Sequence, residues 1–320
     1  MIVLLSADDN YIQHASVTIR SVLANASSPE KLSIKLISDN ISNRNIHKLE
    51  ESLSDFESVL NLDVIEIQEQ QVRRFNPKTD YLSSAIYHRI YAGQFLNGYS
   101  GKVVYLDSDV IVREDIIKLF QVDLGDYSIG AVRNDGLYHQ ESLGMPKDKV
   151  FFNSGILLID LNKWREREIL PKLEAFISEN NDSLKYPDQC AMNAILYDDW
   201  YSLDPKWNMH RYFFLNPTHS ELKRYSLPKR IKSPAIVHFT TRDKPWFFMC
   251  SHPFKKEYYK YLKKTAWADY SPPDLSLHNF YLKYVTKIKS FFKNNYIGLR
   301  GVIGGLMPLS LKRFIRPVSD

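Results

Sequence analysis

The sequence predicts an α/β protein, with a mostly parallel mixed sheet and helices flanking it. Short apolar runs alternate with segments whose apolar residues recur every three or four positions, and this alternation fills the first hundred residues. Repeated strand–helix units of this kind assemble into a parallel sheet with helices on both faces. A length of 320 residues allows one large core, or a core with a small appendage.

The apolar runs place the strands in order along the chain. Strands are expected at residues 2–5, 34–37, 62–67, 103–106, 127–132, 155–160 and 235–239. Helices are expected at residues 12–26, 42–56, 83–96, 162–179 and 188–197. Ser42 is a typical N-cap for the second of these helices. Three prolines between residues 205 and 230 predict long ordered loops there.

The formal net charge of +5 arises from the C-terminal tail, residues 271–320. Residues 271–320 hold eight Lys and Arg against Asp274 and Asp320, a net of +6, which leaves a net of −1 for residues 1–270. This balance argues against nucleic acid as a partner of the main body. We therefore expect two parts, a catalytic domain at 1–270 and a basic helical tail at 271–320.

The two cysteines and the N-terminus favour a reducing compartment. Cys190 and Cys250 form no CxxC motif, which argues against a disulfide framework and a structural zinc site, so both are expected to be packing residues. The N-terminus has no basic segment of a signal peptide. No stretch reaches the roughly 18 apolar residues of a spanning helix. The expected location is cytoplasmic, unless the chain is tethered.

The strongest chemical signal is the segment Val-Val-Tyr-Leu-Asp-Ser-Asp at residues 103–109. A buried strand that ends in Asp107 and Asp109 can direct two hard oxygen ligands into a crevice, and such ligands suit Mg²⁺ or Mn²⁺ holding a diphosphate. In parallel sheets, ligands bind beyond the carboxyl ends of the strands. The turn at residues 7–10, after the first strand, is expected on the same edge. A solvated strand end is the alternative.

A phosphatase of the haloacid-dehalogenase kind would also carry a D-x-D-x-[TV] segment, and residues 107–110 match its first four positions. That interpretation requires the motif near the start of the core and a later G-D-x-x-x-D pair of acids. The motif here comes a hundred residues into the chain, and the later acid pair is Asp198-Asp199. The phosphatase interpretation is therefore disfavoured.

Four further motifs accompany the acid pair. They are Ser6-Ala-Asp-Asp-Asn-Tyr11, Phe152-Asn-Ser-Gly155, Tyr186-Pro-Asp-Gln189 and His238-Phe-Thr-Thr-Arg-Asp-Lys-Pro-Trp246. With them, residues 1 to about 270 resemble glycosyltransferase family 8, and within it the bacterial lipooligosaccharide α-galactosyltransferases. The resemblance implies the Rossmann-like GT-A fold of nucleotide-diphospho-sugar transferases, a UDP-sugar donor, Mn²⁺ (or Mg²⁺) and retention of anomeric configuration.

The resemblance also implies roles for the metal and phosphate residues. His238 would complete the metal site with Asp107 and Asp109, although a histidine at a strand end is more often a packed residue. Lys244 would neutralise the β-phosphate, since a point charge on a flexible stem suits that task. A solvated loop lysine is its alternative. Ser108, between the two acids, is expected to be one of the residues that bind the UDP-sugar donor.

The turn after the first strand is expected to hold the nucleotide. Asp8 and Asn10 could hydrogen-bond the uracil edge and a ribose hydroxyl, Tyr11 could stack on the base, and Ala7 lies beside them in the same motif. The alternative is that Asp8 or Asp9 caps the following helix.

The donor sugar is expected to meet four polar residues. By resemblance Arg89 contacts the sugar, unless it is an ordinary helix-surface arginine. Asn153 could offer its amide to sugar hydroxyls, where the missing side chain of Gly155 lets the ligand approach. Asp188 and Gln189 open a helix, so Asp188 could serve only the helix dipole. Gln189 is a poor nucleophile, which favours same-side attack with the β-phosphate as base.

The sequence departs from the family pattern at the positions expected to contact the donor and acceptor sugars. A donor-side histidine corresponds to Tyr81, the acceptor-side aspartate falls at Asn134 or Asp135, and the small residue expected three positions after His238 is Thr241. The identity of the sugar, galactose or glucose, and the linkage therefore stay open.

The tail combines aromatic and basic residues. Between positions 276 and 297 it contains Phe280, Tyr281, Tyr284, Phe291, Phe292, Lys283, Lys287, Lys289 and Lys293. This pattern is typical of a segment that lies on an anionic membrane. A helix packed on the body with a solvated basic face is the alternative. We expect peripheral association with the inner face of the plasma membrane, where a lipid-linked acceptor would be found.

Together these observations predict a retaining, Mn-dependent glycosyltransferase. It would move galactose or glucose from a UDP-sugar to an oligosaccharide or lipid-linked saccharide acceptor, in the synthesis of lipopolysaccharide or another cell-surface glycan. The alternatives are a transferase that acts on protein-linked glycan and a non-catalytic UDP-sugar sensor.

Overall fold

The computed structural model describes residues 1–67, 75, 84–134, 143–180, 184–210, 213 and 233–284. The chain divides into two compact units, Met1–Trp246 with Ser251–Tyr270, and Phe247–Cys250 with Ser271–Asp320. The first unit contains every strand described and the main core.

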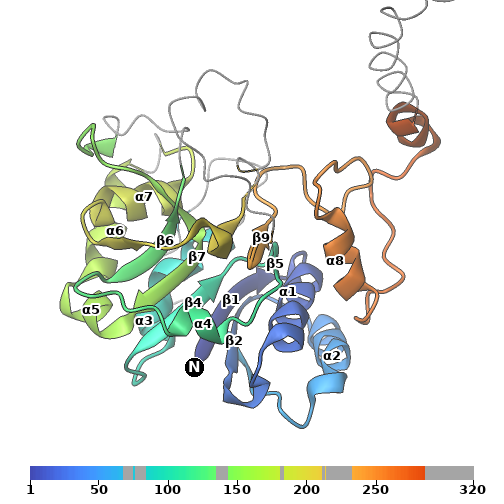
Figure 1. The fold of residues 1–320 in the computed structure, drawn as a ribbon, viewed down its shortest axis with the longest axis horizontal. Helices are drawn as coiled ribbons and strands as arrows, with labels where there is room; N and C mark the ends of the chain where they lie inside the picture. Colours follow the sequence, from blue (N-terminus) through green and yellow to red (C-terminus); the bar gives the residue numbers. More distant parts are fainter. Residues whose placement is uncertain are drawn as a thin grey trace, which may run out of the picture. The chain divides into compact units, whose positions relative to one another are not determined.

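A seven-stranded sheet forms the centre of the first unit, in the order β3-β2-β1-β4-β7-β6-β8 (Figure 1). Its strands are β1 (Ile2–Asp8), β2 (Ser33–Asp39), β3 (Leu62–Glu66), β4 (Lys102–Leu106), β6 (Ile129–Arg133), β7 (Phe152–Asp160) and β8 (Trp200–Ser202). Strands β3, β2, β1 and β4 are parallel, β7 is antiparallel to both β4 and β6, and β8 is parallel to β6. The prediction of a mostly parallel mixed sheet is confirmed.

A second, two-stranded sheet joins β5 (Val110–Val112) to β9 (Ile236–His238) in antiparallel register. The expected strand at 235–239 is therefore real, but it does not belong to the main sheet. Strands β5 and β8 were not predicted from the sequence. Each contains only three residues, and β5 directly follows the acidic turn, so neither is long enough to show a strand period.

Helices surround this sheet. The α-helices are α1 (Ile12–Asn25), α2 (Asn43–Ser52), α3 (Ala92–Phe95), α4 (Ile117–Phe120), α5 (Leu161–Glu166), α6 (Ile169–Asn180), α7 (Pro187–Leu196) and α8 (Lys255–Leu262). The 3₁₀ segments are η1 (Pro29–Lys31), η2 (Ser54–Phe56), η3 (Ser84–Tyr91) and η5 (Pro205–Asn208). Ser42 is the N-cap of α2 as predicted, and its hydroxyl accepts from the backbone N–H of Asn45.

Two expected helices differ in detail. The helix expected at 83–96 is a 3₁₀ segment, η3, that continues into the short α3. The helix expected at 162–179 is broken between α5 and α6, where Glu168 takes a left-handed φ of 50°. A continuous apolar period does not reveal a break of this kind, because both halves face the same core.

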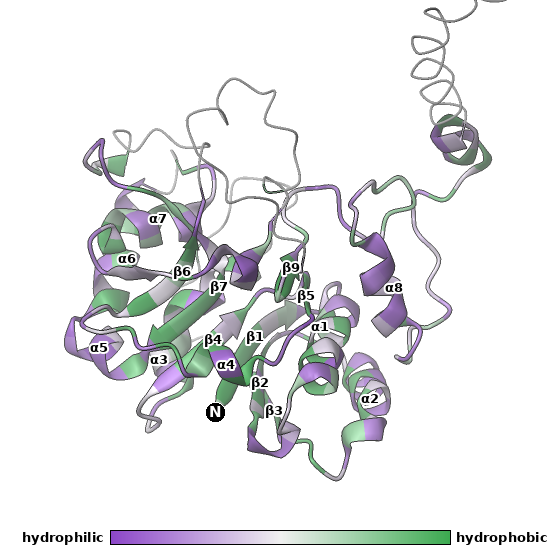
Figure 2. Cartoon of the chain, viewed as in Figure 1, coloured by the Kyte–Doolittle hydropathy of each residue, from purple (hydrophilic) through white to green (hydrophobic). Residues whose placement is uncertain are grey.

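Both faces of the sheet are covered. One face carries Leu4, Tyr105 and Leu157, which pack with side chains from η3, α5, α6 and α7 in the main core. Val3 and Leu5 alternate with Leu4 along β1 and are fully buried as well, so the other face is covered too. Helix α1 contacts both β1 and β5. Figure 2 shows the central strands as hydrophobic and α8 as mainly hydrophilic. The side chains of Cys190 and Cys250 are buried, as expected of packing residues.

The second unit has a small aromatic cluster. The rings of Phe248 and Phe280 stack with their centroids 6.1 Å apart, and the ammonium of Lys283 lies 4.3 Å from the Phe248 ring centroid. Leu277 and Tyr281 are 91% and 62% exposed. Among the described residues of the whole chain, no helix has the length and apolar character needed to cross a bilayer.

A buried histidine gives the first unit a predictable response to acid. The imidazole of His14 in α1 stacks on Trp246 with centroids 3.5 Å apart, and its Nδ1 lies 2.7 Å from the hydroxyl oxygen of Tyr258. Burial lowers the pKa of His14 from 6.5 to about 3. The unfolded chain therefore binds a proton that the folded chain excludes, and stability present above pH 6.5 is lost as the pH falls toward 3.

We expect His14→Phe to flatten this pH dependence. Between pH 7 and pH 5 the loss in free energy of unfolding should be smaller than in the wild type by roughly 2 kcal/mol, since the variant has no proton to take up there. Urea unfolding at both pH values measures it. His47→Phe, at a side chain that is 80% exposed, is the control and should keep the wild-type dependence. An unchanged slope in His14→Phe would contradict the assignment.

Candidate active site

The acidic turn after β4 is held in place by the first strand and helix. Strand β4 lies beside β1, so both strands end on the same edge of the sheet. The hydroxyl of Ser108 donates to the carbonyl of Ser6 over 2.6 Å. The hydroxyl of Thr18 in α1 lies within hydrogen-bond distance of the carbonyls of Ser108 and Val110, at 3.1 and 2.9 Å. The turn at 107–109 is thus positioned by backbone contacts that leave both carboxylates available.

Three side chains converge at this turn. Nε2 of His238 lies 3.6 Å from Oδ2 of Asp107 and 3.2 Å from Oδ1 of Asp109, and one ligand atom from each residue falls within 4.8 Å of the others. The pairing of β5 with β9 places His238 opposite Val110, one residue beyond the acids. The small second sheet therefore delivers the histidine to the end of β4.

A glycine makes this convergence possible. A Cβ on Gly155 would lie 2.2 Å from Cε1 of His238 and 2.5 Å from Oδ2 of Asp107. The carbonyl of Gly155 also accepts from the backbone N–H of Asp107 over 2.8 Å. The space beside Gly155, which the sequence suggested would admit a sugar, is filled by the imidazole and the carboxylate.

The donor set fits a divalent cation. Nδ1 of His238 lies 3.0 Å from the amide oxygen of Asn208, so Nδ1 carries the proton and Nε2 presents a lone pair toward the acids. Oδ1 of Asp109 is buried and makes no hydrogen bond to any residue that the structure describes. Two acceptors thus face each other over 3.2 Å, which a cation would reconcile. Two carboxylates and an imidazole are a donor set that can coordinate a divalent metal ion.

Arg89 supplies charge to this cluster from η3. Its side chain is only 7% exposed, so the interpretation as a surface arginine is wrong. Nη2 lies 2.8 Å from Oδ1 of Asp107, and Nε lies 3.1 Å from Oδ2 of Asp188. Nη1 donates to the carbonyl of Ser154 over 2.8 Å. Burial raises the pKa of the Asp107 carboxyl, and the guanidinium only partly offsets that rise.

Lys244 forms the matching ion pair with the second acid. Its ammonium contacts Oδ2 of Asp109 and donates to the carbonyl of Phe239 over 2.8 Å. The side chain is 16% exposed, so the solvated alternative is wrong as well. Burial by itself would raise the pKa of Asp109, but Lys244 and His238 together outweigh it, so the pKa lies well below its usual range.

An amide network orders the side of the site next to β7. Nδ2 of Asn153 and the backbone N–H of Ser154 both donate to Oε1 of Gln189, each over 3.1 Å. Oδ1 of Asn153 accepts from Nδ2 of Asn208 over 2.8 Å. The amide oxygen of Gln189 is thus already used by two protein donors, which further weakens it as a nucleophile. Asp188, in the first turn of α7, meets Arg89 and so is more than a dipole partner.

The turn after β1 shows how its acids are used. Oδ1 of Asp8 accepts from the backbone N–H groups of Asn10 and Tyr11, over 3.0 and 2.9 Å, and so shapes the turn into α1. Asp9 does not cap the following helix. Its carboxylate accepts from the backbone N–H of Ser42 over 2.8 Å and so contacts the start of α2.

The other two residues predicted to bind the nucleotide, Ala7 and Tyr11, lie in or beside the same turn. Ala7 is buried at the end of β1. The ring of Tyr11 meets Trp246 edge to face, with centroids 5.7 Å apart. Burial raises the pKa of the Tyr11 phenol, so the hydroxyl stays protonated at neutral pH. Stacking of Tyr11 on a base remains a prediction.

Two departures from the family pattern can be located. Tyr81 and Asp135 lie outside the described residues. Asn134 directly follows β6 and is 4% exposed, and its Oδ1 makes no hydrogen bond to a described residue. Thr241 has a left-handed φ of 75°, which explains why a small residue, best a glycine, is expected at its position.

His88, expected to be structural, is packed among polar groups. Its Nδ1 lies 2.6 Å from the hydroxyl oxygen of Ser6, and burial lowers its pKa to about 4. Two other residues of the site, Ser154 and Asn208, were not predicted to belong to it. No sequence signal distinguished Asn208 within a segment expected to be loop, whereas Ser154 lay inside a quoted motif.

The comparison with known proteins decides the family. The model of glycosyl transferase family 8 matches residues 2–250. The chain belongs to glycosyltransferase family 8. It is therefore a glycosyltransferase, and the non-catalytic sensor alternative is not supported.

Individual relatives agree with this assignment. The chain is 33% identical to general stress protein A of Bacillus subtilis over 278 residues, 84% of this chain and 96% of that protein. It is 26% identical to the lipopolysaccharide 1,2-glucosyltransferase of Escherichia coli over 96% of this chain and 89% of that enzyme. The solved galactosyltransferase LgtC, with donor and acceptor sugar analogs, superposes with a TM-score of 0.72, at 23% identity, over 86% of this chain and 98% of that one. This match confirms the GT-A fold.

We expect Gly155→Ala to weaken Mn²⁺ binding at least tenfold, about 1.4 kcal/mol, because the added methyl group displaces His238 or Asp107. Titration of the free Mn²⁺ signal by electron paramagnetic resonance measures it. Gly93→Ala is the matched control, since its methyl group would meet only the side chains of Trp164 and Arg165, remote from the acids. Wild-type affinity in Gly155→Ala would contradict the geometry.

Proposed function

We propose that this glycosyltransferase is a retaining, metal-dependent enzyme that transfers galactose or glucose from a UDP-sugar to a saccharide acceptor. The convergence of Asp107, Asp109 and His238 at the end of β4 carries the proposal. The named activities of two relatives, a glucosyltransferase and a galactosyltransferase, support the sugar class.

The diphosphate would be held by the metal residues and one lysine. Asp107, Asp109 and His238 would hold Mn²⁺ or Mg²⁺, which would supply Lewis-acid stabilisation of the charge that develops on the diphosphate leaving group. The ammonium of Lys244 would turn from Asp109 toward the β-phosphate, which its flexible stem permits. Ser108 holds the turn between the two acids in position.

The donor sugar and base would lie on either side of this centre. Arg89 and Asp188 form one rigid pair, and Asn153 and Gln189 another, so together they can fix the sugar's orientation. Ala7, Asp8, Asn10 and Tyr11 would face the uracil and ribose. Because the oxygen of Gln189 is engaged, we favour attack on the same side as the leaving group, with the β-phosphate as base.

The acceptor would be a saccharide of lipopolysaccharide or of another cell-surface glycan. The similarity to the Escherichia coli enzyme along almost its full length supports this class. Asn134, whose buried amide oxygen lacks a hydrogen bond among the described residues, is the acceptor contact we favour. No feature of the described residues favours a protein-linked acceptor.

UDP release from a panel of UDP-sugars tests the function. We expect turnover with UDP-galactose or UDP-glucose in the presence of Mn²⁺ and its loss with EDTA. Asp109→Asn should lower kcat by about 10²–10³, as expected when a group that stabilises developing charge is removed. Asp126→Asn, at an exposed residue, is the matched control. No release from any donor would contradict the proposal.

We further propose that residues 1–270 are the catalytic domain and that residues 271–320 associate with an anionic membrane. In the described part of the tail, Leu277, Phe280, Tyr281 and Tyr284 are exposed apolar side chains, and Lys283 accompanies them. Apolar side chains with interspersed lysines are typical of segments that lie in the headgroup region.

We expect the full-length variant Leu277→Ser with Tyr281→Ser to bind anionic phosphatidylglycerol vesicles at least roughly tenfold more weakly than the wild type, because two apolar contacts are lost. Sedimentation with vesicles measures it. The control replaces Tyr127 and Tyr201, exposed aromatics of the first unit, with serine. Equal binding of the two variants to the vesicles would contradict the proposal that the tail associates with the membrane.

A further inference from the structure

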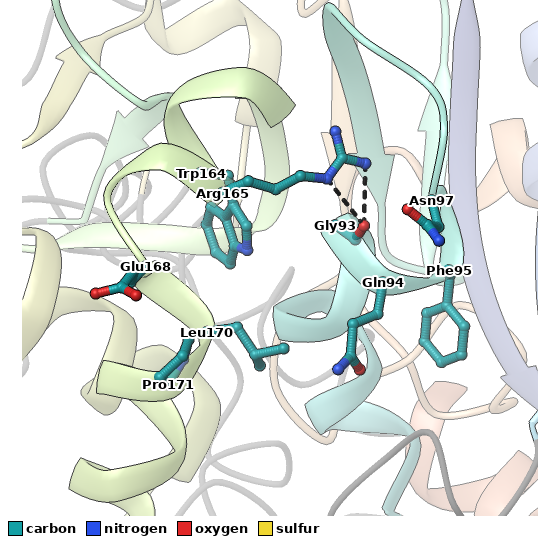
Figure 3. A pocket seen from close by; sticks show the side chains of 9 residues that line it. All are labelled: Gly93, Gln94, Phe95, Asn97, Trp164, Arg165, Glu168, Leu170 and Pro171. Atoms are coloured by element: carbon teal, nitrogen blue, oxygen red, sulfur yellow. Dashed lines mark hydrogen bonds between the residues drawn. The ribbon is translucent and has the colours of Figure 1, made fainter.

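A cavity lies between α3 and the segment that joins α5 to α6 (Figure 3). Its volume is about 570 Å³, within the range of small-molecule sites, about 300–1,000 Å³. Side chains that line it are Gln94, Phe95, Asn97, Trp164, Glu168 and Leu170.

This cavity is separate from the candidate active site. The backbone N–H of Leu161, at the start of α5, donates to the carbonyl of Gly101, just before β4 begins. The cavity is thus at the starting end of β4, whereas Asp107 follows the other end. At about 3.3 Å per residue, the five residues of β4 put roughly 17 Å between the two ends.

The cavity contains a buried donor without a partner. The indole of Trp164 is 2% exposed, and its Nε1 makes no hydrogen bond to a residue that the structure describes. Figure 3 shows the nitrogen edge of the ring facing the opening between the two elements. An unsatisfied buried donor costs about 1–3 kcal/mol, and an acceptor atom of a ligand that reached this nitrogen would offset that cost.

The charges of the lining exclude an anionic ligand. The guanidinium of Arg165 donates to the carbonyls of Gly93, Leu96 and Tyr99 over 2.7–3.0 Å, so its donors are directed at the backbone. The other charged group in the lining is the carboxylate of Glu168. A phosphate or nucleotide would meet repulsion and no available cation.

The remaining groups suit sugar hydroxyls. The amides of Gln94 and Asn97 are exposed and can donate and accept, as a hydroxyl does. Phe95 and Leu170 are half-buried and give apolar surface beside them. Glu168 is held at φ 50°, a costly conformation for a residue other than glycine, and such positions cluster at functional sites.

We propose that this cavity binds a neutral oligosaccharide, as an auxiliary site for the glycan that carries the acceptor. The inference rests on the proposed function, which supplies the glycan. Binding at a second site raises the effective concentration of a glycan near the transfer site without any new contact to the donor.

Tryptophan resonances can test the site directly. The chain has five tryptophans, so ¹⁵N-tryptophan labelling gives five indole N–H signals, and Trp164→Phe assigns the one that matters. We expect neutral gluco- or galacto-trisaccharides at millimolar concentration to shift the Trp164 signal in a saturable way. The shift should persist in Asp107→Asn with Asp109→Asn, which disables the transfer site.

Two variants separate the lining from the rest of the surface. Gln94→Ala with Asn97→Ala should weaken trisaccharide binding at least tenfold, since both amides are lost. Gln121→Ala, at an exposed position after α4, should bind as the wild type does. Two results would overturn the proposal. One is the absence of any shift of the Trp164 signal with a trisaccharide at 20 mM, a concentration on the order of the weakest useful Kd. The other is equal trisaccharide binding by the Gln94→Ala/Asn97→Ala variant and the Gln121→Ala variant.

The outcome is distinguishable from that of the proposed function. Turnover of UDP-sugars without any trisaccharide shift overturns the auxiliary site alone. A saturable shift without turnover of any donor leaves the binding site in place and overturns the transfer reaction.

Discussion

The burial of two neighbouring carboxylates at the end of β4 is the constraint on which the rest of the site depends. Asp107 and Asp109 are separated by one residue, and desolvation and mutual repulsion oppose their charged forms. The structure meets this cost with one cation for each acid, Arg89 for Asp107 and Lys244 for Asp109. Each cation reaches the acids from a different element, so the fold must bring three distant segments together.

That requirement explains features that would otherwise look incidental. The two-stranded sheet β5–β9 exists beside the acids and carries His238 to them, and the glycine of β7 leaves room for the imidazole. Asn208 orients the ring through Nδ1 and leaves the lone pair of Nε2 toward the carboxylates. Nδ2 of Asn208 donates to Asn153, which in turn donates to Gln189, so the residues proposed to bind the metal and the sugar share one hydrogen-bond network.

The sequence predicted the main sheet and its acids well because both are local patterns. A strongly apolar run ending in Asp107 reads as a buried strand from neighbouring residues alone, and the capping by Ser42 likewise depends on a few positions. Partners from distant segments were harder. The burial of Arg89 depends on η3 packing against β7, and the role of Asn208 depends on a contact with His238 thirty residues away. For His238 the resemblance to a family motif predicted the partnership with the distant acids. Asn208 lies in no such motif, so its role was not predicted.

The two cations of the site are not equivalent, and the difference bears on the proposed reaction. The guanidinium of Arg89 is engaged by Asp107, Asp188 and the carbonyl of Ser154 at once, so moving it would leave several buried partners unsatisfied. Lys244 is held by one carboxylate and one carbonyl, on a loop that follows the left-handed Thr241. A cation that neutralises Asp109 would release Lys244 but not Arg89. In the proposed reaction, the lysine would therefore be the group that follows the diphosphate, and the arginine would stay paired with Asp107 and Asp188.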